Sequence, residues 1–390
     1  MKVVHIEAGR HLYGGARQAA YLIAELARRG VSNALVCAPG AAIAEQVAGR
    51  AEIAEIPMAG DLDLSLVPRL RSLLAKLDPD LVHVHSRRGA DLYAGIAAGV
   101  AAGGSRPAVL TRRVDSAEWA PWARFKYARY AAVVAISRAV ERALLHAGVP
   151  RERVRLVPSG VDTERFRPDA SARARLRAAF SLPGDSFVAG VVAQLIPRKG
   201  HGMLLDLLPD VAARHPRFVV ICFGRGPGSE RLAREIAARR LERRVVLAGF
   251  RDDLPALLPG LDALLHPATA EGLGVAVLEA LAAGVPVAAS AVGGIVDVIE
   301  PGAHGLLVPH DDRAAWIEAI DSIVCDSALR TRLAASGRAR VEAEFSARRM
   351  AEGNLAVYEA VLRGRGTARG HGKSASEPET LSSAEIGRRP

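Results

Sequence analysis

Short apolar runs of strand length alternate with helical segments along most of the chain, and this alternation limits the fold more than any other feature. In the first half the apolar runs lie at residues 2–8, 33–39, 52–58, 81–86, 108–111 and 131–137. A second series begins at residue 187. Regular alternation of this kind predicts an α/β protein with parallel, doubly wound sheets, in which ligands bind at the carboxyl ends of the strands.

The size and composition of the chain favour a globular protein of more than one domain. The length of 390 residues suits two to three domains, and no apolar run reaches the ~18 residues that span a bilayer. Cys37, Cys222 and Cys325 fall in apolar segments at unrelated spacings, which indicates buried thiols in a reducing compartment. The N-terminus also lacks a signal-peptide pattern, so we expect a cytoplasmic protein.

The formal net charge of +10 predicts anionic partners, such as phosphates or an acidic lipid surface. No zinc-finger, basic-zipper or RNA-recognition pattern accompanies this charge, so we expect no nucleic-acid partner. Residues 119–130 (WAPWARFKYARY) interleave aromatic and basic side chains. This pattern fits a helix that contacts an anionic membrane surface, and it also fits a helix that packs its rings on a sheet and leaves its arginines in water.

The most informative stretch is residues 267–290, where Glu271-Gly-Leu-Gly274 opens a helix that Gly284 ends. Glycines before a helix let backbone N–H groups approach a ligand, and a helix N-terminus favours negative charge. A second carboxylate, Glu279, lies eight residues after Glu271 on nearly the same helix face. Both carboxylates are suited to accept hydrogen bonds from sugar or ribose hydroxyls, although the spacing alone also fits an ordinary amphipathic helix.

This Glu-x7-Glu spacing, with EGLG at its start and EALAAGVPV at its end, resembles the donor-sugar motif of the retaining glycosyltransferases of family 4, which have the GT-B fold. The resemblance implies two Rossmann-like domains that face a central cleft. It also implies that Glu271 is catalytic and orients the donor sugar together with the amides of Gly272, Leu273 and Gly274. Glu279 would bind the nucleotide ribose.

Other donor-binding residues follow from the same resemblance. Arg198 and Lys199 match a basic element that stabilises charge on the leaving diphosphate, although Gln194 stands where the family usually has an arginine. Phe250 and Arg251 match the region that meets the donor base. The resemblance implies no metal cofactor.

In the first half, Gly14 and Gly15 follow the first strand and resemble the family's glycine loop, which would let this domain close on the donor. Arg17 stands where many relatives have a glutamate. TRRVD occupies the place of a histidine that acts near the reacting sugar in many relatives, so His85, at another strand end, is the nearest catalytic candidate. A lone histidine at a strand end is, however, more often structural.

Several arginines at predicted strand ends are candidates for binding the acceptor. Arg112 and Arg113 suit an acceptor that bears phosphate or carboxylate, because a guanidinium group grips these anions with two hydrogen bonds. Arg17 joins them as a third candidate, and Arg87 and Arg88 follow the neighbouring strand end.

The domain boundaries also follow from the resemblance, because VPSGVDTERFRP matches the family's interdomain element. We expect an acceptor-side domain at 1–160, a nucleotide-sugar donor domain at 166–345, a helix at 346–362 that crosses back to the first domain, and a disordered, Gly/Ser-rich tail at 363–390.

These observations predict a retaining glycosyltransferase that moves a sugar from a nucleotide-diphosphate sugar to an anionic lipid-linked or cell-envelope glycan, for example in lipopolysaccharide biosynthesis. Such a protein would be peripheral on the inner face of the membrane. Two alternatives stay open. One is a GT-B enzyme that epimerises or hydrolyses a nucleotide sugar. The other is a non-catalytic sugar-nucleotide binding protein, which the missing glutamate after Gly15 favours.

Overall fold

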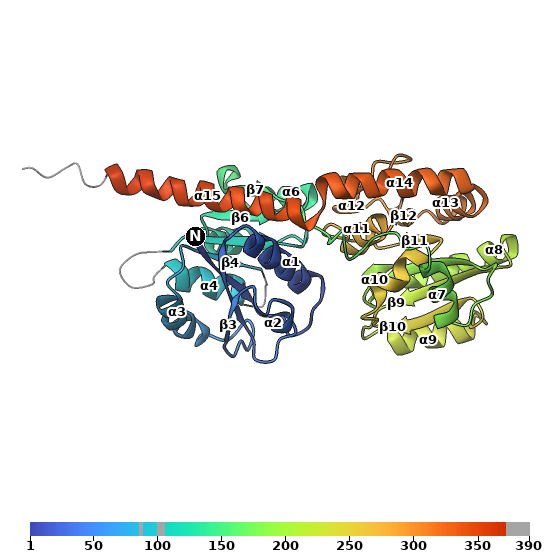
Figure 1. Cartoon of the computed structure of the whole chain (residues 1–390), viewed down its shortest axis with the longest axis horizontal. Coiled ribbons are helices and arrows are strands. Elements are labelled where there is room, and N and C mark those ends of the chain that lie inside the picture. Colours follow the sequence, from blue (N-terminus) through green and yellow to red (C-terminus); the bar gives the residue numbers. More distant parts are fainter. Residues whose placement is uncertain (86–88, 100–105, 372–390) are drawn as a thin grey trace, which may run out of the picture.

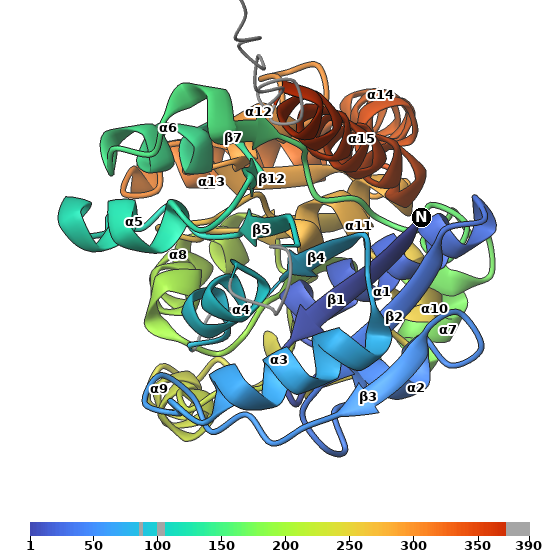
Figure 2. The same cartoon turned by 90° about the vertical axis from the view of Figure 1, so that its left-hand side faces the viewer.

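The computed structural model describes residues 1–85, 89–99 and 106–371, with side chains as far as Gly364. Within these residues the chain forms two parallel sheets, each flanked by helices (Figure 1). We call the first sheet with its helices the N-terminal lobe and the second the C-terminal lobe. Figure 2 looks onto the N-terminal lobe, with the other lobe behind it. Arg87 and Arg88 lie outside the described residues.

The N-terminal sheet has the strand order β3-β2-β1-β4-β5-β6-β7. Its strands are β1 (Lys2–Glu7), β2 (Ser32–Cys37), β3 (Glu52–Glu55), β4 (Leu81–Val84), β5 (Ala108–Arg112), β6 (Ala132–Ala135) and β7 (Val154–Leu156). The helices between them are α1 (Gly14–Arg28), α2 (Ile43–Gln46), α3 (Leu66–Leu77), α4 (Ala90–Gly99), α5 (Ala120–Tyr127) and α6 (Arg138–His146).

The C-terminal sheet has the order β10-β9-β8-β11-β12-β13. Its strands are β8 (Phe187–Val192), β9 (Phe218–Phe223), β10 (Val245–Gly249), β11 (Ala263–His266), β12 (Val287–Ser290) and β13 (Leu306–Val308). Its helices are α7 (Ala172–Ala179), α8 (His201–Arg214), α9 (Ser229–Ala238), α10 (Leu254–Leu257), α11 (Val275–Ala282), α12 (Ile295–Val298), α13 (Arg313–Cys325) and α14 (Ser327–Glu344).

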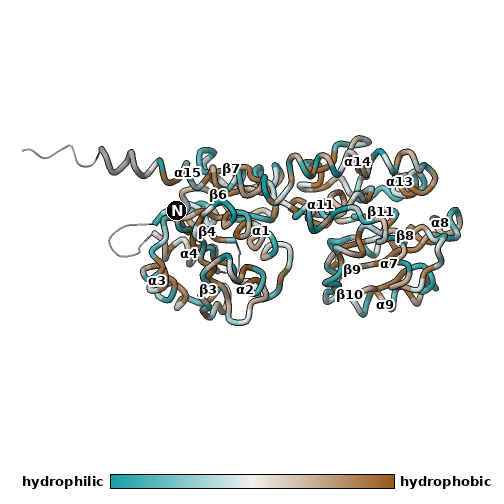
Figure 3. The backbone as a smooth tube through the Cα atoms, viewed as in Figure 1, coloured by the Kyte–Doolittle hydropathy of each residue, from teal (hydrophilic) through white to brown (hydrophobic). Residues whose placement is uncertain are grey.

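The strands form because their sequences are apolar on both faces, as a parallel sheet covered by helices requires. In β9, FVVICF, all six residues are buried, and β8 and β9 are hydrophobic along most of their length (Figure 3). The edge strand β3, EIAE, is mostly exposed. The predicted α/β fold with two doubly wound, Rossmann-like sheets is confirmed.

The strand orders place a ligand site in each lobe. The strand order reverses between β1 and β4 in the N-terminal sheet and between β8 and β11 in the C-terminal sheet. Loops that leave the carboxyl ends of such strands diverge there and open a crevice. The loops in question begin with residues 8 and 85 in the first lobe, and with residues 193 and 267 in the second.

The last helix, α15 (Ala347–His371), lies along the N-terminal lobe and packs against α1 (Figure 1). Met350, Ala351 and Tyr358 of α15 join Val3 and Leu22 in one hydrophobic cluster. The last helix is therefore part of the hydrophobic core of the N-terminal lobe. The helix continues to His371, and residues 372–390 of the predicted disordered tail lie outside the described residues. Extending a helix that is already packed costs little compared with starting one.

Among the described residues, no helix combines the length and the apolar character that a membrane span needs.

Candidate active site

The loop that opens the 267–290 stretch lies against the N-terminal lobe. A Cβ atom on Gly272 would lie 2.2 Å from the carbonyl oxygen of Arg113, and one on Gly294 would lie 2.7 Å from the Cβ of Ser137. The amide of Arg138 donates to Asp297 across the same boundary, at 2.6 Å. Glycine is therefore required at Gly272 and Gly294, because backbone from the two lobes meets there.

Glu271 lies in a buried cluster with Lys199 and His266. The Lys199 ammonium group donates to one carboxylate oxygen, and His266 Nε2 lies 3.1 Å from the same oxygen. Burial alone would raise the pKa of Glu271, but the hydrogen bond with His266 and the charge of Lys199 hold this pKa at about 2. The carboxylate is thus ionised and fixed in place at the start of α11.

A short turn brings Lys199 to this cluster. Pro197–Lys199 form one turn of 3-10 helix, which Gly200 ends with a φ of +75°. A Cβ atom on Gly200 would lie 1.8 Å from the carbonyl oxygen of Pro267, so only glycine lets the turn lie this close to the end of β11. Arg198 is exposed and points its guanidinium group toward the carbonyl of Ala270, at 3.5 Å.

Glu279, about one helical turn after the start of α11, contacts the other lobe. Its carboxylate accepts a hydrogen bond of 2.8 Å from Arg17, and only 3% of its side chain is exposed. Burial raises the pKa of Glu279, and Arg17 opposes this effect. The structure therefore places Arg17, which the sequence suggested for the acceptor, against a predicted donor residue.

Gly14 and Gly15 begin α1 beside this contact. A Cβ atom on Gly14 would meet no described atom within 4 Å, and one on Gly15 would meet Arg113 at an ordinary 3.6 Å. Packing of the described residues thus does not require glycine at either position. Close approach of a ligand remains the predicted reason for both glycines.

Arg112 and Arg113 are adjacent in sequence but differ in their surroundings. Arg112 is buried and pairs with Glu118 at 2.7 Å and with the hydroxyl of Tyr127 at 2.6 Å. Arg113 is half-buried and donates a hydrogen bond of 3.3 Å to the hydroxyl of Ser159. Its Nε atom has no partner among the described residues. Arg113 is therefore the more available of the two predicted acceptor residues.

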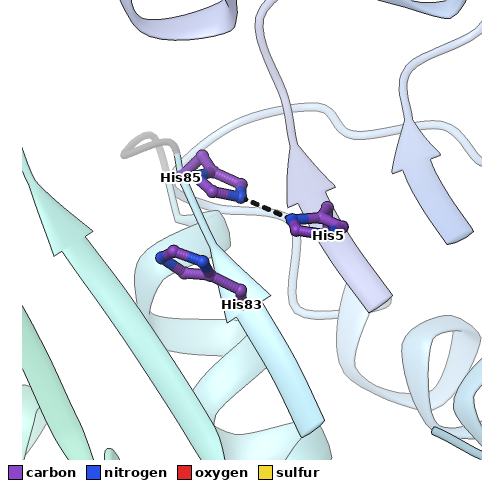
Figure 4. Close-up of side chains that lie close together, drawn as sticks. All are labelled: His5, His83 and His85. Carbon is purple, nitrogen blue, oxygen red and sulfur yellow. Dashed lines mark hydrogen bonds between the residues drawn. The ribbon is translucent and has the colours of Figure 1, made fainter. Parts of the chain in front are cut away.

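His85 belongs to a cluster of three buried histidines with His5 on β1 and His83 on β4 (Figure 4). Asn33 donates its amide to the carbonyl of Val31, so its oxygen faces His5 Nε2 at 3.1 Å and accepts that proton. His5 Nδ1 then carries a lone pair and accepts from His85 Nε2 at 2.9 Å. His85 Nδ1 is left as a buried lone pair without a partner in the described chain.

This hydrogen-bond chain determines what the three histidines can do. Burial lowers the pKa of His85 well below its ordinary value, so the ring is neutral and its Nδ1 can accept a hydrogen bond from a hydroxyl group. The three side chains also offer nitrogens within 4.8 Å of one another, which could hold a metal ion. However, His83 bonds to Tyr358 and Thr111, so five of the six ring nitrogens already have partners. The absence of a metal cofactor stays a prediction.

The predicted base-binding residues lie just after β10. Phe250 is 39% exposed, and Arg251 is held by Asp253 through two bonds of 2.7 and 2.6 Å. Their contact with a donor base stays a prediction. His266, in contrast, was not predicted, although its place directly before the 267–290 motif marks it as a strand-end residue at the ligand edge of the sheet.

Two family models match the chain. The model described as Glycosyl transferases group 1 matches residues 172–340, and that described as Glycosyltransferase Family 4 matches residues 13–165. Among curated relatives, the GDP-mannose-dependent alpha-(1-6)-phosphatidylinositol monomannoside mannosyltransferase of Mycolicibacterium smegmatis is 34% identical over 215 residues, 53% of this chain and 56% of that protein. The lipopolysaccharide core biosynthesis mannosyltransferase LpsB of Rhizobium meliloti is 28% identical over 249 residues, 62% of this chain and 69% of that protein. The chain spans about half the length of the first of these relatives.

Solved structures show the same fold at low sequence identity. Anabaena HepE in complex with UDP superposes with a TM-score of 0.80 at 22% identity, over 92% of this chain and all of that one. A glycosyltransferase from Rickettsia africae superposes with a TM-score of 0.80 at 18% identity, over 93% of this chain and 98% of that one. The matched models span both lobes of the structure described above, and the chain belongs to the glycosyltransferases of group 1 and family 4, with the GT-B fold.

Proposed function

We propose that the protein is a retaining glycosyltransferase that uses a nucleotide-diphosphate sugar as donor. The observation that carries this proposal is the buried cluster of Lys199, Glu271 and His266 at the carboxyl ends of β8 and β11, with Glu279 on the helix that follows. HepE was solved with UDP, and the mycobacterial relative is named as dependent on GDP-mannose. Sugars linked to UDP or GDP are therefore the first donors to test.

In the proposed reaction, Arg198 and Lys199 stabilise the negative charge that develops on the leaving diphosphate. Fixed cations at such a position typically accelerate a reaction by about 10²–10³-fold each. The Glu271 carboxylate accepts hydrogen bonds from hydroxyls of the donor sugar. The amides of Gly272, Leu273 and Gly274, at the N-terminus of α11, lie beside it and hold the sugar against the diphosphate. No metal ion is required for these steps.

On the acceptor side, the available guanidinium group of Arg113 suits a phosphate or carboxylate. A hollow of about 450 Å³ lies nearby, lined by Asp115, Ala117, Glu118, Ala139, Arg142, Ala143, His146 and Ala147. One of these lining residues, Asp115, also lies against the C-terminal lobe, 3.2 Å from where a Cβ atom on Gly293 would be. Both features support an acceptor that enters from the N-terminal lobe.

The aromatic residues of 119–130 divide into two sets. Tyr127 and Tyr130 are buried in the core, and Lys126 is buried in ion pairs with Asp91 and Glu118. Trp119, Trp122 and Phe125 are instead 75%, 43% and 49% exposed. Exposed rings beside arginines suit the headgroup layer of an anionic membrane, which supports a lipid-linked acceptor.

The test is a transfer assay with radiolabelled UDP-glucose and GDP-mannose and a bacterial lipid extract as acceptor. We expect a labelled lipid whose anomeric configuration, read by NMR, is that of the donor. Lys199→Ala should lower turnover about 100-fold. Lys2→Ala is the control, because Lys2 lies at the amino end of β1, where it makes an exposed ion pair with Glu52. Inverted product would refute retention, and release of free sugar at the same rate without lipid would indicate a hydrolase.

A further inference from the structure

The first two turns of α1 place polar groups of the N-terminal lobe around Glu279 of the C-terminal lobe. Arg17 donates to the Glu279 carboxylate at 2.8 Å. Tyr21 lies one helical turn after Arg17, and only 9% of it is exposed. It interacts electrostatically with Glu279 and with Arg17. Gln18 fixes the helix by bonding both the N–H and the carbonyl of Gly160, at 2.9 and 2.6 Å.

Two of these groups lack partners. Arg17 Nε and the Tyr21 hydroxyl are buried, and neither makes a hydrogen bond within the part of the chain that the structure describes. Buried polar groups in folded proteins nearly always have a partner, because an unmade bond costs free energy. The Arg17 Nε–H and the Tyr21 hydroxyl therefore have bonding capacity to spare, and both belong to side chains that interact with the Glu279 carboxylate.

We infer that Arg17 and Tyr21 form the N-terminal half of the nucleotide site and bind, with Glu279, the vicinal diol of the ribose. This inference rests on the proposed function, since that function makes Glu279 a ribose ligand. Each ribose hydroxyl can donate to the carboxylate and accept from Arg17 Nε–H or the tyrosine hydroxyl. Residues from both lobes then contact one nucleotide, so the bound nucleotide adds to the contact that Arg17 and Glu279 already make between the lobes.

The ion pair between Arg17 and Glu279 also makes binding at this site depend on pH. Glu279 is faced by Arg17 and Tyr21 from α1 and by Arg165 from the segment that joins the two lobes. Burial raises the pKa of Glu279, whereas Arg17 and then Arg165 lower it. Removal of Arg17 should raise this pKa further, so that the carboxylate becomes protonated at a higher pH and accepts fewer bonds from the diol.

The experiment is calorimetric titration of the full chain with UDP, with GDP and with their 2′-deoxy forms. The wild type should bind one of the two ribonucleotides and bind its 2′-deoxy form more weakly. Arg17→Met should weaken the ribonucleotide about tenfold or more, the effect of one charge-assisted hydrogen bond, and should reduce discrimination against the 2′-deoxy form. Its affinity should also rise with pH more steeply than that of the wild type, because the Glu279 carboxylate loses its proton at a higher pH when Arg17 is absent.

Two further variants distinguish an effect on nucleotide binding from an effect on folding. Tyr21→Phe keeps the buried ring and removes the hydroxyl, so it should fold normally and lose part of the discrimination between the two sugars. Arg28→Met, at the exposed end of α1 where Arg28 pairs only with Glu25 in the described structure, should bind as the wild type does.

The outcomes distinguish this inference from the proposed function. A wild type that binds neither nucleotide refutes both. A wild type that binds, together with Arg17→Met and Tyr21→Phe variants of equal affinity and equal discrimination, overturns only the inference. Tighter binding by Arg17→Met also overturns it, because Arg17 would then compete with the ribose.

Discussion

Replacement of Lys199 by methionine should destabilise the C-terminal lobe, because it leaves the Glu271 carboxylate buried with one partner fewer. The two side chains are only 12% and 15% exposed. The pKa of Glu271 lies at about 2 instead of its ordinary 4.5, and at 1.36 kcal/mol for each tenfold change this corresponds to about 3 kcal/mol in favour of the ionised form. Loss of one partner from a buried ion pair typically costs about 3–5 kcal/mol.

We therefore expect Lys199→Met to lower the unfolding free energy by about 3 kcal/mol. For a lobe of this size this corresponds to a melting temperature lower by roughly 6–12 °C. The contribution has a definite pH dependence. Because the folded pKa of Glu271 is below the unfolded value, the stabilisation is fully present above about pH 4.5 and is lost as the pH falls toward 2.

The assay is thermal unfolding followed by circular dichroism at neutral pH. The double variant Lys199→Met/Glu271→Gln should recover most of the lost stability, because no buried charge remains unpaired, yet it should not recover transfer activity. Lys2→Met should melt within about 1 °C of the wild type, because exposed ion pairs contribute little. An unchanged melting temperature for Lys199→Met, or a double variant as unstable as the single one, would refute this reasoning.

Three further predictions concern the lobe boundary, the membrane surface and the metal. Gly272→Ala should reduce transfer, because its Cβ would lie 2.2 Å from the carbonyl oxygen of Arg113; Gly202→Ala, which meets no described atom within 4 Å, should leave the kinetics unchanged. Trp122→Ser combined with Phe125→Ser should weaken sedimentation with phosphatidylglycerol vesicles at low salt, and sedimentation equal to that of the wild type would count against lipid contact. Excess EDTA should not affect transfer, whereas a loss that added Mg²⁺ restores would overturn the metal-free reaction.

The fold was predictable because its signal is local. Each buried strand is a short apolar run and each connection contains a helix, so the doubly wound sheets follow from the sequence alone. The contact between Lys199 and Glu271 could also be predicted, because the two residues follow the carboxyl ends of the neighbouring strands β8 and β11. The ends of elements were less predictable: the helix expected at 346–362 runs from Ala347 to His371.

Contacts between distant segments could not be predicted, because no local pattern encodes them. Arg17 and Glu279 are 262 positions apart, and only the packing of the lobes brings them together. Arg112 and Arg113 look alike in sequence, but alternate residues of a strand end face opposite sides, so one is enclosed by Glu118 and Tyr127 while the other faces the boundary between the lobes. The lone pair of His85 follows only from the bond between Asn33 and Val31.

The most direct test of the central claim is a crystal structure of the protein with UDP-glucose or GDP-mannose. We expect ribose hydroxyls within hydrogen-bond distance of the Glu279 carboxylate, the diphosphate beside Arg198 and Lys199, and the sugar against Glu271. A sugar nucleotide bound away from Glu271 and Glu279, with the present contacts of both carboxylates intact, would refute the proposed donor site.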